Sequence, residues 1–209
     1  MKNYLLATAA AVCLSACAGT KVTNTVIAQG ATSPKAIFIR PFNVADGAYN
    51  GAHGGAAAKA IRQSQAPAQF AGVLKGELEK IAPAAVIAHD EEGEFGWEVD
   101  GDIEIVNAGC PAARAVAGGF GLGRSGVLIH VRVTEIGSTS RRDEKGGDGP
   151  TIYEFDVAGG SRLMGPAGSI HSSGLGNSVP FDMRNAAEKI REMLEVDGHR
   201  YGVRESARH

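Results

Sequence analysis

The sequence predicts an α+β domain: a mainly antiparallel sheet with two principal helices packed on it, joined by long glycine-rich connections. Two segments, 97–106 and 127–134, alternate apolar and polar residues as half-buried strands do. Two others place apolar residues at helical spacing. Glycine accounts for 29 of the 209 residues, about twice its usual share of ~7%. At this length a single domain is the expected organisation.

The strands are predicted from their alternation. The run "KAIFIRPF" is apolar and β-branched before Pro41, which predicts a first strand over 35–40. The inward positions of the two alternating strands are Trp97, Val99, Ile103 and Ile105, and Val127, Ile129, Val131 and Val133. Their outward positions carry Glu98, Asp100, Asp102 and Glu104, and Leu128, His130, Arg132 and Thr134. Because opposite charges on facing strands attract, we expect antiparallel neighbours with Arg132 near the carboxylates.

A further strand follows the charged, glycine-rich segment "SRRDEKGGDGP". The run "TIYEFDVA" places Tyr153, Phe155 and Val157 on one face, so it is predicted to form a hairpin with the strand over 127–134.

Two helices are predicted between prolines and glycines. The first follows Pro67 and ends before Pro83, and the second follows Pro180 and ends at Gly198. Their apolar stripes are Phe70, Val73, Leu74, Leu78 and Ile81, and Ala186, Ala187, Ile190, Met193 and Leu194. The glycine- and alanine-rich stretch 43–60 shows no stable period and is predicted to be a surface excursion.

The N-terminus has the pattern of an export signal. Lys2 precedes an uncharged, mostly apolar run over 4–14 that is too short to span a bilayer. Residues 14–17, "LSAC", then match the bacterial lipobox, in which small residues precede a cysteine whose thiol accepts a diacylglyceryl group. Residues 16–18, "ACA", also satisfy an ordinary A-x-A cleavage pattern. We expect lipidation at Cys17, with several acyl chains giving stable membrane anchoring.

These signals divide the chain into a signal peptide (1–16), a lipidated tether (17–33), one α+β domain (34–198) and a flexible tail (199–209). Ala18 resembles the residue found in lipoproteins sent to the outer membrane. We therefore expect a protein anchored in the cell envelope, at the outer membrane and facing the periplasm. Cys110 is the other cysteine left after cleavage, so no disulfide framework is expected.

The segment "GGFGLGRSG" at 118–126 contains a G-x-G-x-x-G string and a Walker A pattern with arginine in place of lysine. A dinucleotide site needs a helix after the glycines, because the pyrophosphate lies on that helix's N-terminus. Here the following segment is a predicted strand, so no nucleotide is expected. The glycines instead allow a long connection to fold tightly between antiparallel strands.

No catalytic or metal-binding pattern is found in the sequence. The chain lacks G-x-S-x-G, and its six histidines form no H-x-x-x-H pair. Asp100, Asp102 and Glu104 imitate a calcium loop, but Ile105 occupies the position that needs glycine. The net charge of −2 gives no reason to expect nucleic acid. We therefore expect a non-enzymatic protein without a metal or cofactor.

Residues 97–136 resemble a family of bacterial lipoproteins known only as domain of unknown function 4410. The similarity extends over roughly 35–160 and includes a G-F-G-x-G-[KR]-S motif between an acidic strand and an alternating strand. The matching residues are Gly101, Glu104, Arg114, Gly119, Phe120, Gly121, Gly123, Arg124 and Ser125, with Phe70, Leu74, Glu77 and Leu78 upstream. The resemblance implies a lipoprotein but gives these residues no role.

Two functions remain open from the sequence. The first is a lipid-anchored envelope protein that serves as a scaffold or assembly accessory for a protein partner. The second is a lipoprotein that binds a small anionic ligand through the Gly118–Gly126 loop and Arg124.

Overall fold

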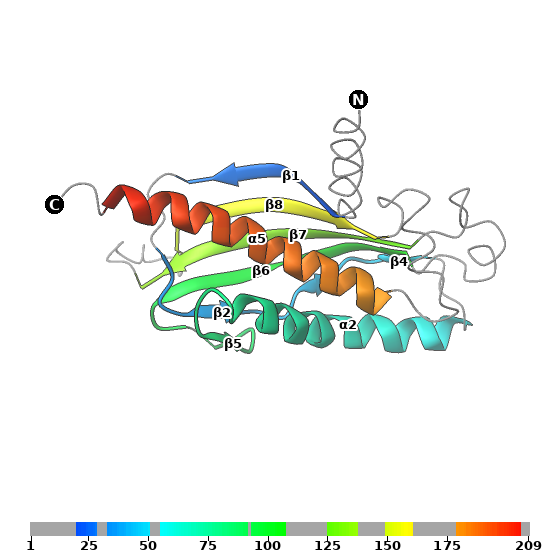
Figure 1. The fold of residues 1–209 in the computed structure, drawn as a ribbon. Helices are drawn as coiled ribbons and strands as arrows, with labels where there is room; N and C mark the ends of the chain where they lie inside the picture. Colours follow the sequence, from blue (N-terminus) through cyan, green and yellow to red (C-terminus); the bar gives the residue numbers. More distant parts are fainter. Residues whose placement is uncertain are drawn as a thin grey trace, which may run out of the picture.

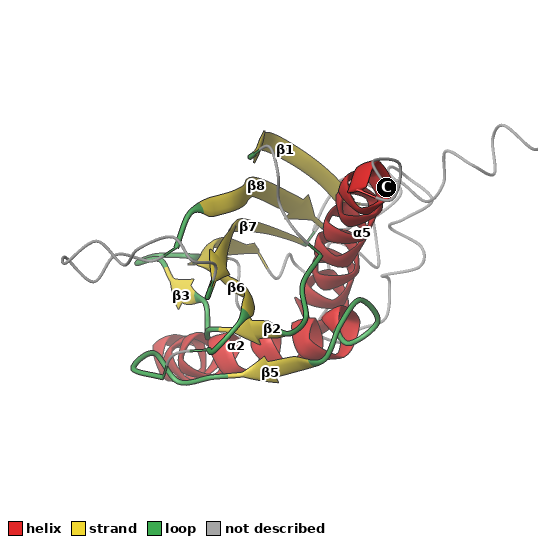
Figure 2. Ribbon diagram, turned by 90° about the vertical axis from the view of Figure 1, so that its left-hand side faces the viewer, coloured by secondary structure: helices red, strands yellow, loops and turns green. Residues whose placement is uncertain are grey.

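The computed structural model describes residues 20–28, 33–50, 55–91, 93–107, 125–137, 149–160 and 179–205. Within these residues eight strands form one mixed sheet, and two long helices lie on the same side of it (Figures 1 and 2). The strands are β1 (Thr20–Ile27), β2 (Ile37–Ile39), β3 (Asn43–Val44), β4 (Tyr49–Asn50), β5 (Ala84–Val86), β6 (Gly96–Asn107), β7 (Gly126–Ile136) and β8 (Thr151–Gly159); the helices are α2 (Gly55–Leu78) and α5 (Val179–Glu205). The predicted α+β class is confirmed.

The sheet has the order β1-β8-β7-β6-β2-β5. Its larger part, from β1 to β6, is antiparallel, whereas β2 runs parallel to both β6 and β5. The short β3 and β4 also pair in parallel with β6, further along that strand. The predicted first strand, the predicted hairpin and the predicted antiparallel pairing of the two alternating strands are all confirmed.

The alternation of β6 is interrupted near its end. The pairing with β7 shifts between Ile103 and Ile105, so Glu104 is an extra residue that has no partner in the register. Such a bulge exchanges the two faces of a strand. Val106 is consequently fully buried, while Ile105 is 43% exposed. The prediction that Ile105 points inward is therefore wrong.

Helix α2 begins much earlier than predicted. The prediction of a surface excursion over 43–60 is wrong for the described residues of this stretch, because 43–50 contain β3 and β4 and 55–60 begin a helix that continues through Pro67. Alanine has the highest helix propensity, so this alanine-rich stretch forms a helix although its apolar residues show no period. Pro67 omits one backbone hydrogen bond, but buried Ala66 and Phe70 beside it hold the helix against the core.

Both ends of the fold extend beyond the predicted domain. β1 lies inside the segment predicted to be a tether, and it pairs with β8 from Thr20 onward. Its side chains are mostly exposed, so the strand has little of the apolar alternation by which strands are recognised. At the other end, α5 continues past Gly198, where the helix was predicted to end, to Glu205.

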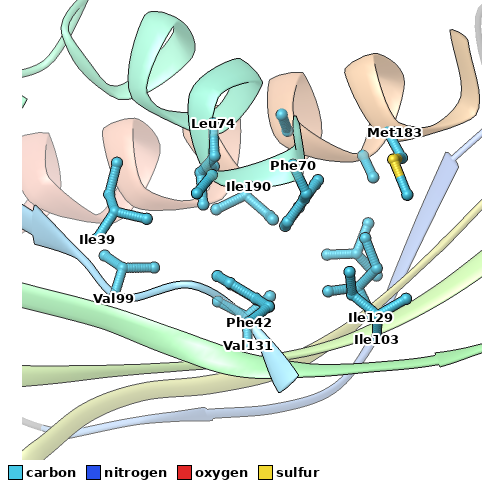
Figure 3. Packing of buried hydrophobic residues seen from close by; sticks show 14 of the residues in the cluster. Ile39, Phe42, Phe70, Leu74, Val99, Ile103, Ile129, Val131, Met183 and Ile190 are labelled. Atoms are coloured by element: carbon cyan, nitrogen blue, oxygen red, sulfur yellow. The ribbon is translucent and has the colours of Figure 1, made fainter. Parts of the chain in front are cut away.

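The hydrophobic core lies between the helices and the sheet (Figure 3). Most residues of the predicted stripes are buried: Phe70, Leu74 and Leu78 from α2 and Ala186, Ala187, Ile190 and Leu194 from α5. The others, Val73, Ile81 and Met193, are partly buried and pack against the core. Phe42 and Phe70 meet edge to face, with ring centroids 5.0 Å apart, and join the sheet to α2. Because both helices pack on this face, the other face of β6, β7 and β8 carries their polar side chains.

Candidate functional site

The open face of the sheet contains a hollow of about 610 Å³. It is lined by Arg40, Pro41, Asn43, His89, Asp90, Glu98, Asp100, Gly101, Asp102, His130, Arg132, Thr151 and Glu154. We refer to this set as the charged hollow. Five of these residues carry carboxylates and two carry guanidinium groups, so the hollow is acidic when its histidines are neutral.

The centre of the charged hollow is a cross-strand arrangement on β7. Arg132 stands opposite Asp100 of β6 and Glu154 of β8, and its guanidinium donates two hydrogen bonds to Asp100, of 3.0 and 3.1 Å. The sequence predicted this proximity of Arg132 to the carboxylates of β6, and the structure confirms it.

His130 lies two residues before Arg132 on β7, so its side chain is on the same face of the sheet. It stands opposite Asp102 and Asp156, and its Nδ1 lies 2.8 Å from Asp156 Oδ1, while its Nε2 lies 3.4 Å from Glu154 Oε1. Asn24, at the irregular part of β1, donates a hydrogen bond to the other oxygen of Asp156. Side chains of three strands are therefore joined through one carboxylate.

This contact changes the protonation of both partners. The hydrogen bond to Asp156 raises the pKa of His130, and the charges of Asp156, Glu154 and Asp102 add to the effect, while burial partly offsets it. For Asp156, burial opposes ionisation, but the hydrogen bonds from His130 and Asn24 outweigh it and lower the pKa of the carboxyl. The arrangement thus favours a charged imidazolium–carboxylate pair.

In the charged hollow, Arg40, which directly follows β2, contacts β6 and the loop between β5 and β6. Its guanidinium binds the Glu98 carboxylate at 2.6 and 3.0 Å and donates further hydrogen bonds to the carbonyl oxygens of Ala88 and His89. The side chain of Glu98 is only 6% exposed, so the pair is nearly desolvated. No local pattern predicts this contact, because Arg40 and Glu98 are 58 residues apart in the sequence and β2 pairs with β6 in parallel.

Of the predicted site residues, Gly101 and Ser125 lie in the described part of the chain. Glu104, which also matches the family, lies there too and is the unpaired residue of β6. Gly101 is buried on β6, and a Cβ there would lie 2.0 Å from the carbonyl oxygen of His130 and 2.8 Å from the ring of Phe42. Ser125 is 1% exposed and immediately precedes β7. The structure does not bring Gly101 and Ser125 together, because Gly101 pairs with Val131 in the middle of the β6–β7 ladder, whereas Ser125 lies at its end, next to Gly126. Gly101 therefore has a packing role.

The other predicted site residues lie outside the described residues. They are Cys17, Arg114, Gly119, Phe120, Gly121, Gly123 and Arg124, together with Cys110. The structure does show that the chain enters β7 at Gly126, so a strand follows the glycine motif, as predicted. This is not the strand-to-helix order of a dinucleotide-binding turn.

The chemistry of the charged hollow is that of binding through charge and hydrogen bonds. Its two arginines are joined to Glu98 and Asp100 in ion pairs, and the carboxylates of Asp102 and Glu154 also line it. Among the described residues no group of three or more histidine, cysteine or acidic side chains is placed to hold a metal ion. No helix in that part of the chain is long and apolar enough to span a membrane.

Comparison with known proteins identifies no family for this chain. No family model matches it, and no curated protein does. Among solved structures, two PelC dodecamers from Paraburkholderia phytofirmans, one of them a variant, are similar to it at 10% and 9% identity, with a TM-score of 0.44 in each case. The alignments cover 82% of this chain and 97% of the PelC chain. Similarity at this level assigns no function.

Proposed function

We propose that this protein is an exported, lipid-anchored envelope lipoprotein that acts as a non-enzymatic scaffold or assembly accessory. The lipobox ending at Cys17 supports the anchor, and the resemblance to lipoproteins of the domain of unknown function 4410 family agrees with it. The observation that carries the binding role is the charged hollow on the sheet face opposite the two helices.

A protein partner fits this face better than a small anion does. The hollow has five carboxylates and two guanidinium groups, and both arginines are held by Glu98 and Asp100. A small anion would meet net negative charge there, whereas basic side chains of a partner would find acceptors in Asp102 and Glu154. The partner's contact surface should therefore carry more basic than acidic groups.

Crosslinking in the native envelope tests the binding role. The double charge reversal Asp102→Lys with Glu154→Lys should abolish the crosslinked partner, because repulsion replaces attraction at the rim. Glu188→Lys is the matched control, since it reverses one exposed charge on α5, away from the hollow. If all three proteins retain the same partner, the face is not the binding surface.

The anchor needs its own test, because binding and anchoring are separate properties. Wild-type protein should incorporate radiolabelled palmitate, and a Cys17→Ala variant should not. Equal labelling of the two proteins would remove the lipid anchor from the proposal.

A further inference from the structure

The position of the first residue of β1 limits how the domain can be oriented on a membrane, provided that Cys17 carries the lipid as proposed above. Only three peptide steps separate Cys17 from Thr20, the first residue of β1. A fully extended chain covers at most about 3.6 Å per residue, so Thr20 lies within about 11 Å of the lipidated residue. A flexible tether over 17–33, as the sequence predicts, would leave the orientation free.

Thr20 lies at one end of the sheet, which we call the anchor end. Thr20 pairs with Gly159, and Gly159 also pairs with Val127 near the start of β7. A Cβ on Gly159 would lie 3.6 Å from Thr20 Cγ2 and 3.7 Å from the carbonyl oxygen of Asp182 in α5. The first residues of β1 and β7 and the first turn of α5 therefore meet at Gly159, and Figure 1 shows that all three elements begin on the right-hand side of the molecule.

Strands β6 and β8 both end at the anchor end. Asn107, the last residue of β6, pairs with Gly126, the first residue of β7, and β8 ends at Gly159.

The anchor end exposes a large apolar side chain. Phe181, in the first turn of α5, is 43% exposed. Phe95, which is 61% exposed, precedes β6 at the opposite end. The 12 residues of β6 separate these ends by roughly 36 Å at about 3.3 Å per residue. Only one of these two aromatic side chains can lie near the membrane surface if the anchor end faces it.

We propose that the anchor end faces the bilayer and that Phe181 contacts the lipid headgroup region, while Phe95 points away into the periplasm. Aromatic side chains are favoured at the membrane–water boundary, and burying Phe181 there adds to the binding given by the acyl chains. The charged hollow lies on the sheet face between the two ends, so it stays accessible to a partner protein.

The experiment uses the lipidated protein in vesicles of phosphatidylethanolamine and phosphatidylglycerol. In a Cys110→Ser background, Phe181→Cys and Phe95→Cys each provide one thiol for an environment-sensitive fluorophore, because the Cys17 thiol is occupied by lipid. Both variants replace an exposed phenylalanine, so each serves as the other's control for folding, checked by circular dichroism.

Lipids with a nitroxide on the headgroup should quench the fluorophore at position 181 and leave the fluorophore at position 95 as bright as in buffer. Equal quenching at the two positions, or stronger quenching at position 95, would overturn the orientation.

Flotation of the same samples separates this inference from the proposed anchor. Wild-type protein should float with the vesicles, and a Cys17→Ser variant should not. If the wild type does not float, the anchor and the orientation are both wrong. If it floats but the fluorophore at position 181 is not quenched more than that at 95, the orientation alone is wrong.

Discussion

Arg132 on β7 pairs directly with Asp100 on β6, and its guanidinium donates two hydrogen bonds to the Asp100 carboxylate. Asp100 is mostly covered and Arg132 is 45% exposed, so water partly screens the pair. A double-mutant cycle with Asp100→Ala and Arg132→Ala should give a coupling free energy of unfolding of about 0.2–1 kcal/mol. Urea unfolding measures it. The coupling should shrink in 1 M salt, and a cycle without coupling at low salt would contradict the assignment.

The Arg132–Asp100 pair could be predicted from the sequence, because the alternation of apolar and polar residues along a strand is a local signal. In β6 and β7 each residue's neighbours in the sequence decide its face, and facing charges then favour one pairing. The same signal gave the inward face of β8, and helical spacing gave the buried stripes of α2 and α5. The pattern failed at Ile105, where one unpaired residue, Glu104, exchanges the faces. Nothing in the local sequence marks that bulge. It also failed at Thr134, which was predicted to point outward but is 1% exposed, at the point where the pairing of β7 with β8 shifts.

The elements that were missed depend on contacts distant in the sequence. β1 is an edge strand with few buried side chains, and β8, more than 120 residues away, gives it its backbone partners. The Arg40–Glu98 contact depends on the parallel pairing of β2 with β6. No short turn joins these two strands, so no local sequence pattern predicts that they pair. His130 was identified as an outward residue, but its partner Asp156 could be found only by extending the alternation of β8 to its polar positions.

Gly101 should tolerate no side chain, because its backbone lies against β7. A Cβ would lie 2.0 Å from the His130 carbonyl oxygen, so Gly101→Ala should lower the free energy of unfolding by about 2–3 kcal/mol or more through overpacking. Gly72→Ala is the control: it lies on α2 with open space around its Cβ position and should stabilise by up to about 1 kcal/mol. Thermal unfolding of both variants measures this. A Gly101→Ala protein as stable as wild type would show that the strands separate more easily than the structure indicates.

Glu77 joins the two helices. Its carboxylate accepts hydrogen bonds from Lys80 at 2.7 Å and from Arg191 of α5 at 3.2 Å, and its side chain is only 11% exposed. Glu77→Gln should lower the free energy of unfolding by about 1–3 kcal/mol, since a charged partner is lost from a mostly buried pair. Glu79→Gln, which removes an exposed pair with Lys75 on the same helix, should change it by less than about 0.5 kcal/mol.

The Glu77 carboxylate should also make the free energy of unfolding decrease at low pH. The hydrogen bond from Lys80 is the main reason why the pKa of Glu77 lies below its ordinary value of 4.5. A lowered folded-state pKa gives stability that is present above the unfolded-state pKa and is lost as the pH falls through the folded-state value. Urea unfolding between pH 6 and 3, at about one-unit steps, should therefore show a smaller acid loss for Glu77→Gln than for wild type. Parallel curves would contradict this.

His130 should give the opposite dependence at higher pH. Its pKa is raised above the ordinary value of 6.5, chiefly by the hydrogen bond to Asp156, with Glu154 and Asp102 adding to the effect. A raised folded-state pKa gives stability that is full below the unfolded-state value and is lost as the pH rises through the folded-state value. The free energy of unfolding should therefore fall between about pH 6 and pH 8 more steeply in wild type than in His130→Gln. The difference between the two curves isolates His130 from the other histidines, and titration of its imidazole by NMR should give a lower pKa in Asp156→Asn than in wild type. If Asp156→Asn leaves the pKa of His130 unchanged, the hydrogen bond to Asp156 is not what raises that pKa.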